Sequence, residues 1–460
     1  MAHEDQVMNN NNEYSRRDFL KFSLSAGMVA ALGNFVPAAA AAPTDYKALV
    51  CIFLFGGNDG HNTIIPMATT EYNAYLAKRG GLALTGNRLL PVTTTTGGQY
   101  AFNYGMPEIQ RLFQQGKVAV LANTGILNQP TTKQQYQQNS VPLPTQLFSH
   151  SDQIVQMQAG IPNASASSGW GGRIADLVQS DNAGTTFPTS ISFNGSSLYV
   201  AGLSVPATNL QPGNSLVQYA MGSGWPQAAV DARAVAQKNA AALGSNNRMI
   251  AAADKVMNDT WRLNSILQGS SGGNLATVFP SSQLGNQLKE VARFINLRGQ
   301  TGAGRQVFFC GLGGFDTHSG QDYQQWDLLK QVSLAVKAFY DATIEMGVAD
   351  KVTAFTLSDF GRSLEPSGSG SDHGWGSHHM IVGGAVRGGQ VYGSFPILNQ
   401  NDSAYDPDAF ADNRGVLLPT SSLAQYGATL AKWFGAADSQ LAGLFPEIDN
   451  FSARDLGFMV

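Results

Sequence analysis

The 460-residue sequence is poor in charged residues and in cysteine. Only 13% of its residues are charged, about half the ~25% usual for globular proteins, and its formal net charge is −4. This charge gives no electrostatic reason to expect binding to nucleic acid or to an anionic membrane surface. Its only cysteines, Cys51 and Cys310, are too few for a disulfide framework. Because each lies in an apolar run, we expect two buried thiols. A single disulfide would require the two runs to be neighbouring strands.

The sequence also lacks a long apolar run. No stretch approaches the ~18 residues that a membrane-spanning helix requires, so we expect no stable span in the mature chain. Residues 1–42 read as a polar leader, the segment SRRDFLK, a short apolar run and a stretch of alanines. The paired Arg16 and Arg17 ahead of that run resemble a twin-arginine secretion signal. The resemblance implies transport of a folded protein by the twin-arginine export machinery and a periplasmic or secreted location.

The rest of the chain alternates between buried strands and helices. Helical patterns separate several short apolar runs, and the order strand, helix, strand predicts right-handed crossovers. We therefore expect an α/β domain over residues 43–460, with a mostly parallel central sheet and helices on both faces. Residues 183–300 show no distinctive chemistry and are interpreted as a largely helical cap or insertion. The runs typical of buried parallel strands are residues 47–55, 117–121, 305–310 and 352–357.

Histidine is scarce too, and its distribution is uneven. The chain has seven histidines, and none lies between Gly160 and Phe315. Apart from one in the leader, all follow a predicted strand or precede a predicted helix. Side chains at strand ends are typical of active sites in open α/β sheets. These histidines are His61, His150, His318, His373, His378 and His379.

Aspartates accompany the histidines. Asp316 and His318 are two residues apart, so in an extended backbone both side chains project to the same face and can reach one ion. Oxygen and nitrogen donors together suit zinc, manganese or iron better than calcium. The sequence therefore predicts a site for a divalent metal, favouring zinc or manganese, with one or two ions. The other aspartates in these segments are Asp59, Asp359 and Asp372.

Ser149 precedes a predicted helix and has two interpretations. A serine there can cap the helix through its side chain. A serine beside a histidine at a helix N-terminus is also well placed as a nucleophile toward an anionic substrate. The residues alone leave both roles open for Ser149 and Ser151.

The mature chain contains the motifs GGNDGHNTIIP, GWGGR, GGFDTH and TLSDFGRS followed by SDHGWGSHH. These motifs resemble those of the twin-arginine-exported family called domain of unknown function 1501, and the resemblance covers nearly the whole mature chain. It implies a place in the alkaline phosphatase and sulfatase superfamily, an alkaline phosphatase-like fold and metals at the strand ends. The implied reaction is hydrolysis or transfer of phosphate or sulfate esters of a small-molecule or anionic substrate.

The resemblance also implies roles for individual residues. Ser149, with His150, is the candidate for nucleophilic catalysis, and Arg362, rather than Arg173, for neutralising the charge of the ester. Phe360 stands where the superfamily has a ligand histidine, and His373, in a second SDHG, is a candidate to replace it. The implied metal ligands are Asp59, Asp316, His318, Asp359, His373 and His378.

A second class of function stays open at this point. The chain is alternatively a non-catalytic exported protein, for binding or envelope assembly, that keeps the superfamily fold. Phe360 and the low-charge, Asn/Gln-rich composition favour this alternative. A third interpretation, an oxidoreductase that loads its metal before export, has no flavin or haem motif to support it.

Overall fold

The computed structural model describes residues 45–460, apart from 163–164, 184, 186, 214–224, 399–410, 413 and several positions between 245 and 274. The predicted signal segment therefore lies outside the described residues. The chain divides into two compact units, residues 1–33 with 216–266 and residues 34–215 with 267–460. In the first unit, the structure describes helix α7 (Gln227–Ala242) and parts of the chain that follows it. The second unit holds the central sheet and the predicted site residues.

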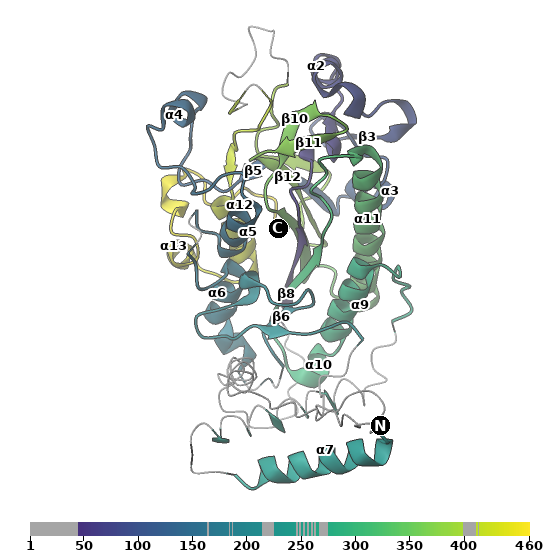
Figure 1. The fold of residues 1–460 in the computed structure, drawn as a ribbon, viewed down its shortest axis with the longest axis vertical. Helices are drawn as coiled ribbons and strands as arrows, with labels where there is room; N and C mark the ends of the chain where they lie inside the picture. The colour runs from purple at the N-terminus through teal and green to yellow at the C-terminus, as the bar shows by residue number, and fades with distance from the viewer. Residues whose placement is uncertain are drawn as a thin grey trace, which may run out of the picture. The chain divides into compact units, whose positions relative to one another are not determined.

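A nine-stranded mixed sheet forms the centre of this unit (Figure 1). The strand order is β13-β5-β12-β9-β1-β8-β6-β7, and β14 also pairs with β5. Every pairing is parallel except those of β12, which runs antiparallel to both β5 and β9, so the predicted mostly parallel sheet is confirmed. The strands are β1 (Lys47–Leu54), β5 (Val118–Gly125), β6 (Ser190–Ser192), β7 (Thr208–Asn209), β8 (Arg305–Leu312), β9 (Val352–Ser358), β12 (Ser377–Gly383), β13 (Gln390–Tyr392) and β14 (Ser421–Ser422).

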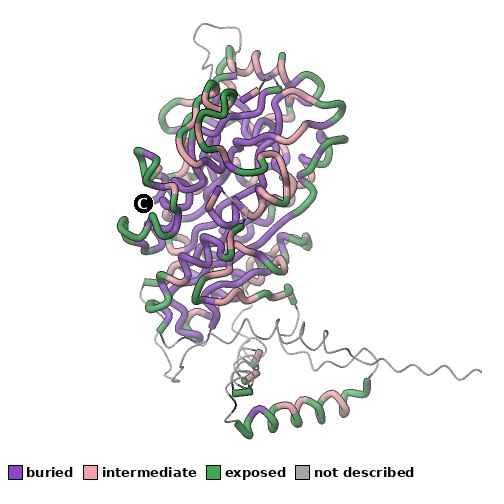
Figure 2. The backbone as a smooth tube through the Cα atoms, turned by 60° about the vertical axis from the view of Figure 1, so that its left-hand side comes forward, coloured by how far each residue is buried: buried purple, intermediate pink, exposed green. Residues whose placement is uncertain are grey.

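Helices cover both faces of the sheet, as the alternating pattern predicted. Figure 1 shows α5, α6 and α12 on one side and α3, α9 and α11 on the other. The strands between them are buried on both faces, and buried residues run through the centre of the unit (purple in Figure 2). The helices are α2 (Thr69–Arg79), α3 (Pro107–Gln114), α4 (Lys133–Gln138), α5 (His150–Ala159), α6 (Trp170–Leu177), α9 (Gln283–Asn296), α10 (Arg298–Thr301), α11 (Gln321–Glu345), α12 (Leu423–Phe434) and α13 (Leu441–Leu444).

Strand β1 shows why its sequence is continuously apolar. Alternate residues point to opposite faces, so Leu49, Cys51 and Phe53 pack in a cluster with residues of α6 and α12. The intervening residues face the other layer of helices. Cys310 on β8 pairs in register with Ile52 rather than with Cys51, so the two thiols project to opposite faces. Both cysteines are buried and free, as expected.

The register brings three strand ends to one edge of the sheet. Leu54 at the end of β1 lies beside Leu312 of β8 and Ser358 of β9. The loop after β1 passes directly against the loop after β8 at Gly56, whose φ is +115°. A Cβ atom at Gly56 would lie 2.3 Å from the backbone nitrogen of Asp316, so only glycine fits there. The three loops that carry the predicted site residues are therefore packed together.

Two smaller sheets flank this edge. A hairpin of β10 (Arg362–Ser367) and β11 (Gly370–His373) follows β9 directly. A three-stranded sheet has the order β2 (Ile64–Pro66), β4 (Gln99–Asn103) and β3 (Leu89–Thr93).

The segment interpreted as an insertion, residues 183–300, is divided between the two units. Its strands β6 and β7 extend the central sheet, and α9 packs beside β8. None of the described helices is both long and apolar enough to cross a membrane.

Candidate metal centre

Three histidines and one aspartate converge at the edge where β1, β8 and β9 end. His150 is the first residue of α5, and His373 is the last residue of β11. Asp316 and His318 come from the loop between β8 and α11. Three segments far apart in the sequence thus deliver four potential ligands to one place.

The donor atoms of this cluster are close to one another. The Nε2 atom of His373 lies 3.1 Å from Nε2 of His150 and 3.0 Å from Nε2 of His318. Oδ1 of Asp316 lies 3.4 Å, 3.5 Å and 3.0 Å from the Nε2 atoms of His150, His373 and His318. Ligands bound to zinc in a tetrahedron at 2.0–2.1 Å would lie about 3.3 Å apart. The donor atoms of His150, Asp316 and His373 therefore fit one small divalent ion, and His318 is a further potential ligand beside them.

Hydrogen bonds on the far side of two rings fix which nitrogen is available. Nδ1 of His150 lies 2.7 Å from Oδ2 of Asp359, and Nδ1 of His373 lies 2.8 Å from the carbonyl oxygen of Phe148. Both partners are acceptors, so each Nδ1 donates and each neutral ring presents an unprotonated Nε2 to the cluster. Two such lone pairs 3.1 Å apart repel each other unless a proton or a metal ion lies between them. Histidine ligands of metals are oriented by this kind of bond.

The loop that supplies the Phe148 carbonyl is strained. Gln146 and Phe148 both have positive φ angles, 52° and 72°, which are unusual for residues other than glycine. This backbone turn aims a carbonyl at His373 and, two residues later, begins α5 at His150. Strain of this kind is commonly found at functional sites.

Buried partners hold the two carboxylates of the site. Asp359 is 1% exposed, and both its oxygens accept from the backbone N–H of Gly56, at 3.1 Å and 3.2 Å. Asp316 accepts from the buried guanidinium of Arg362 at 3.0 Å. Burial alone would raise the pKa of Asp316, but the bond to Arg362 and its charge lower this pKa below the usual value. Asp316 is thus kept ionised, as a metal ligand must be.

The neighbours also shift the pKa values of the histidines. The hydrogen bond to Asp359 is the main cause that raises the pKa of His150. Burial lowers the pKa of His373, and this effect outweighs the bond to the Phe148 carbonyl. Of these two rings, His150 therefore binds a proton more readily than His373. The four ligand side chains are between 26% and 46% exposed, so a small molecule can reach them from solvent.

Phe360 forms an apolar wall behind two of the rings. Its ring centroid lies 4.7 Å from that of His150 and 4.9 Å from that of His373, and the side chain is buried. The same ring packs against Gly57, where a Cβ atom would lie 2.6 Å away. At the position where the resembled superfamily has a ligand, this chain thus has a packing residue.

The geometry brings together most of the predicted site residues. His150, Asp316, His318 and His373 form the cluster, while Asp359 and Arg362 orient two of its members. Asp372 lies on the outer side, with Oδ1 3.6 Å from Nδ1 of His318.

Asp59 and His378 lie in other surroundings. The Asp59 carboxylate pairs with the buried guanidinium of Arg79 and accepts from Gln321. Nδ1 of His378 accepts a backbone N–H from Asn123 at 3.0 Å, which in a neutral ring places the proton on Nε2. This tautomer disfavours binding of a metal through Nε2. The Nε2 atoms of His378 and His61 are both buried and without a hydrogen-bond partner, and burial lowers both pKa values.

The predicted nucleophile stands at the N-terminal cap of α5. The side chain of Ser149 makes no hydrogen bond to the helix backbone, so it does not cap the helix. Its hydroxyl donates to the carboxylate of Asp152 and lies 3.2 Å from the hydroxyl of Ser151. Ser149 is partly exposed and therefore open to solvent.

The two arginines differ in what they contact. Arg362 donates to Asp316, to the carbonyl of Gly56 and to Ser371, and its side chain is fully buried. Arg173 donates to the carbonyls of Ser168, Ala159 and Leu444, and so ties helix ends together. Both guanidinium groups are therefore occupied by the protein itself.

Comparison with known protein families places the chain. The model of the family described as "Protein of unknown function (DUF1501)" matches residues 46–443. The chain belongs to the DUF1501 family. A model of the twin-arginine translocation (TAT) pathway signal sequence matches residues 13–33 of this DUF1501 protein. The protein is therefore exported, to the periplasm or beyond, as its N-terminus predicted. No curated protein matches the chain.

Solved structures with a similar arrangement include three that cover most of this DUF1501 chain. Ps i-CgsB in complex with k-i-k-neocarrahexaose has a TM-score of 0.36 and 10% identity, over 88% of this chain and 77% of that one. The PsFucS1 sulfatase from Pseudoalteromonas sp. has a TM-score of 0.33 and 11% identity, over 92% of this chain and 73% of that one. A protein in the alkaline phosphatase superfamily from Vibrio parahaemolyticus has a TM-score of 0.31 and 11% identity, over 91% of this chain and 75% of that one. At these TM-scores the likenesses support no statement about activity.

Some residues of the DUF1501 site had little or no signal in the sequence. The Phe148 carbonyl could not be predicted, because its role depends on a positive φ at a phenylalanine. Gly56 carried a signal, since a glycine at a strand end permits a sharp turn, but its bond to Asp359 depends on the register of β1 and β9.

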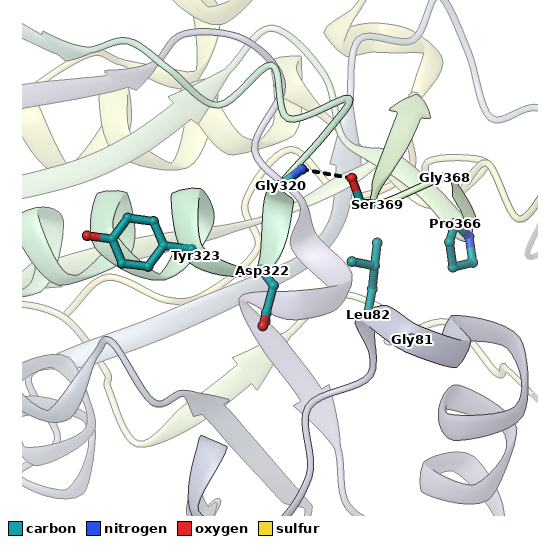
Figure 3. Close-up of a pocket in the computed structure, with 8 residues that line it drawn as sticks. All are labelled: Gly81, Leu82, Gly320, Asp322, Tyr323, Pro366, Gly368 and Ser369. Atoms are coloured by element: carbon teal, nitrogen blue, oxygen red, sulfur yellow. Dashed lines mark hydrogen bonds between the residues drawn. The ribbon is translucent and has the colours of Figure 1, made fainter.

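A surface cavity lies beside the loops that carry His318 and His373. Its volume is about 420 Å³, and Gly320 and Ser369, joined by a 3.0 Å hydrogen bond, are part of its lining (Figure 3). Figure 3 shows Leu82 and Pro366 facing this hollow, whereas the Tyr323 ring extends away from it. The lining includes Asp322 but no basic side chain, so it is unsuited to an anionic group.

Proposed function

We propose that this DUF1501 protein is an exported metal-dependent hydrolase or transferase that acts on phosphate or sulfate esters. The observation that carries the proposal is the convergence of the Nε2 atoms of His150 and His373 and Oδ1 of Asp316, with donor separations of 3.1–3.5 Å and His318 beside them. His150, Asp316 and His373 would hold one divalent ion and leave a position for water or substrate, and His318 lies beside them as a further potential ligand. A set of nitrogen and oxygen donors suits zinc, and manganese next.

The orientation of the rings supports this assignment over a hydrogen-bonded cluster of histidines. Two of the rings already use Nδ1 as a donor, so their Nε2 atoms have only lone pairs to offer. Asp359, which orients His150, is in turn held by Gly56, and Asp316 is held by Arg362. Ligands supported in this way are typical of metal sites rather than of incidental surface clusters.

Different side chains would have different roles in ester cleavage. A bound divalent ion would polarise the ester and lower the pKa of a water or hydroxyl beside it. Asp359 keeps Nε2 of His150 free, and Phe360 keeps water away from one side of His150 and His373. Ser149 is the proposed nucleophile, and Asp152, which accepts its hydrogen bond, is placed to take its proton.

One observation favours the alternative, a non-catalytic exported binding or envelope-assembly protein with the same metal centre. An enzyme that acts on anionic esters usually offers a free guanidinium to the substrate. Here the guanidinium of Arg362 is occupied by Asp316, Gly56 and Ser371. Catalysis would therefore rely on the metal to offset the charge of the ester, whereas simple binding of a ligand would not need a second cation.

The experiment compares metal content and turnover in the exported, folded protein. We expect one equivalent of zinc or manganese after reconstitution and dialysis, and hydrolysis of 4-nitrophenyl phosphate or 4-nitrophenyl sulfate. His373→Ala should lose the metal, whereas His379→Phe, which changes a buried histidine outside the cluster, should keep it. Wild-type protein that retains no metal would refute the site. Metal retained without turnover of either ester would favour the binding protein.

A further inference from the structure

A second cavity lies at the same edge of the sheet, beside the ends of β6 and β7. Its volume is about 370 Å³. Residues directly after β6 and β7 line one side, and the first turns of α9 line the other. Side chains and loops at the carboxyl ends of strands are where open α/β sheets bind their ligands.

The register places this cavity at the same edge as the metal centre. Strand β6 runs parallel to β8, with Ser192 beside Phe309, and β8 runs parallel to β1. All three strands therefore end at the same edge. Neighbouring strands lie about 4.8 Å apart, so β6 is roughly 10 Å from β1 across β8, and Asn194 after β6 reaches Gly311 near the end of β8.

The lining is made of carboxamides. Five of the side chains are asparagine or glutamine, and none of the lining residues is ionisable: Asn194, Gln211, Gln283, Asn286 and Gln287. Each carboxamide offers both donors and an acceptor, which matches hydroxyl groups that donate and accept at once. A charged ligand would find no counter-charge there. The chemistry thus selects an uncharged ligand with many hydroxyl groups.

Part of the lining is rigid and part is free to exchange partners. Gln287 is buried and makes two hydrogen bonds to the backbone of Gly311, 2.8 Å and 3.0 Å long. Oδ1 of Asn194 accepts from Gln283 and Gln287 at 3.4 Å and 3.3 Å, which are long and weak bonds. Ligand hydroxyls can replace them at little cost. Gln211, Gln283 and Asn286 are exposed and meet a ligand directly.

An apolar floor completes the cavity. Phe193 is buried, with its ring edge-on to Phe294 at 5.3 Å, and Pro212 lies beside the cavity. An apolar surface with a few polar groups around it is the usual construction of a small-molecule site. A sugar ring has the matching form, with C–H groups on its faces and hydroxyls at its edge.

We infer that this cavity binds an uncharged, polyhydroxylated part of the substrate, of the saccharide class. Its role as a substrate subsite rests on the proposed function, because the ester of the same molecule would reach the metal centre. The lateral separation of β6 and β1 requires a substrate body at least on the order of 10 Å long. The substrate class that follows is a phosphate or sulfate ester of an oligosaccharide.

The test uses binding rather than turnover, so it is independent of the proposed reaction. The exported protein is applied to an array of neutral and sulfated glycans, and the Kd for the best neutral glycan is then measured by titration. We expect a neutral oligosaccharide to bind. The double variant Gln283→Ala/Asn286→Ala should weaken this binding at least tenfold, because two of the three exposed carboxamides are removed while alanine preserves helix α9. Gln300→Ala, an exposed carboxamide on α10, should leave it unchanged.

Three results would overturn the inference. They are an array on which no glycan binds, a double variant with wild-type affinity, and loss of neutral-glycan binding in His373→Ala. The last result would place recognition at the metal centre instead. Glycan binding that persists in His373→Ala, together with a metal-loaded wild-type protein that shows no esterase turnover, would refute the proposed reaction and leave saccharide recognition by the cavity standing.

Discussion

Replacing Asp359 by asparagine tests the metal centre through a residue that is not proposed to touch the metal. The carboxylate accepts from Nδ1 of His150 and from the backbone N–H of Gly56. An asparagine has the same shape but only one acceptor oxygen. Its NH₂ group must then face one of the two donors. Facing Nδ1, it makes the His150 ring turn or change tautomer; facing Gly56, it leaves Nδ1 with a neutral and weaker acceptor. The lone pair on Nε2 of His150 would then no longer be held as firmly toward the metal.

The size of the effect follows from the role of Asp359. Loss of a partner that orients a ligand histidine typically lowers metal affinity 10–100-fold. This factor corresponds to about 1.4–2.7 kcal/mol of the stabilisation that saturating metal gives. Loss of a buried hydrogen bond to a charged group costs a further ~1.5–3 kcal/mol, even without metal. Asp359→Asn should therefore be less stable in both forms and gain less from the metal.

The assay separates these two effects. Zinc affinity is measured by competition with a chromogenic chelator, and unfolding free energy by denaturant titration with and without zinc. The control is Asp176→Asn, because Asp176 accepts three backbone N–H groups, from Leu203, Ser204 and Val205, outside the cluster. It should lose stability without losing zinc affinity. Wild-type zinc affinity in Asp359→Asn, or an equal loss in both variants, would refute the reasoning.

Three further predictions follow from buried groups. Arg79→Met should destabilise the protein by about 3–5 kcal/mol, because it leaves the Asp59 charge buried and unpaired. In denaturant unfolding, the double variant with Asp59→Asn should recover part of that loss. No recovery would contradict the pairing. Phe360→Ala should lower the free energy of unfolding by about 3–5 kcal/mol, because the ring is buried against His150 and His373. Phe360→Leu should lower it less. Equal stability of the two variants would argue against this packing. Burial lowers the pKa of His379 to about 4 in the folded state, against about 6.5 when unfolded, so its contribution is complete above pH 6.5 and falls by up to about 3 kcal/mol as the pH drops to 4. Unfolding curves at several pH values should show this loss and a smaller one in His379→Phe, which keeps the stacking on Tyr426; an identical pH dependence in both proteins would contradict it.

Local sequence patterns could predict the sheet and the places where the site residues occur. Apolar runs such as residues 47–55 have no polar face, which marks them as central strands, and glycines at their ends mark sharp turns. These patterns led to His150, Asp316, His318 and His373 because each lies where a strand or helix begins or ends. The sequence could not say which of several histidines share one ion. That depends on register, such as the pairing of Arg362 with His373 in the β10–β11 hairpin.

The surroundings of Asp59 and His378 show the same limit. Both follow the expected pattern of a polar residue near a strand end. Their partners, Arg79 and the backbone of Asn123, come from elements whose packing no local pattern describes. The strained carbonyl of Phe148 is a similar case, since phenylalanine gives no indication of a positive φ. Long-range packing therefore decides which of the predicted site residues lie close together.

The wide spacing of the four ligands along the chain links metal content to folding. His150 comes from a helix, Asp316 and His318 from a loop far downstream, and His373 from a hairpin later still. A chain that is incomplete or misfolded cannot bring these groups together, so it cannot hold the ion tightly. The ratio of metal to protein in a purified sample would then report the fraction of correctly folded molecules. The ion acquired would be one that is available in the compartment where the chain folds.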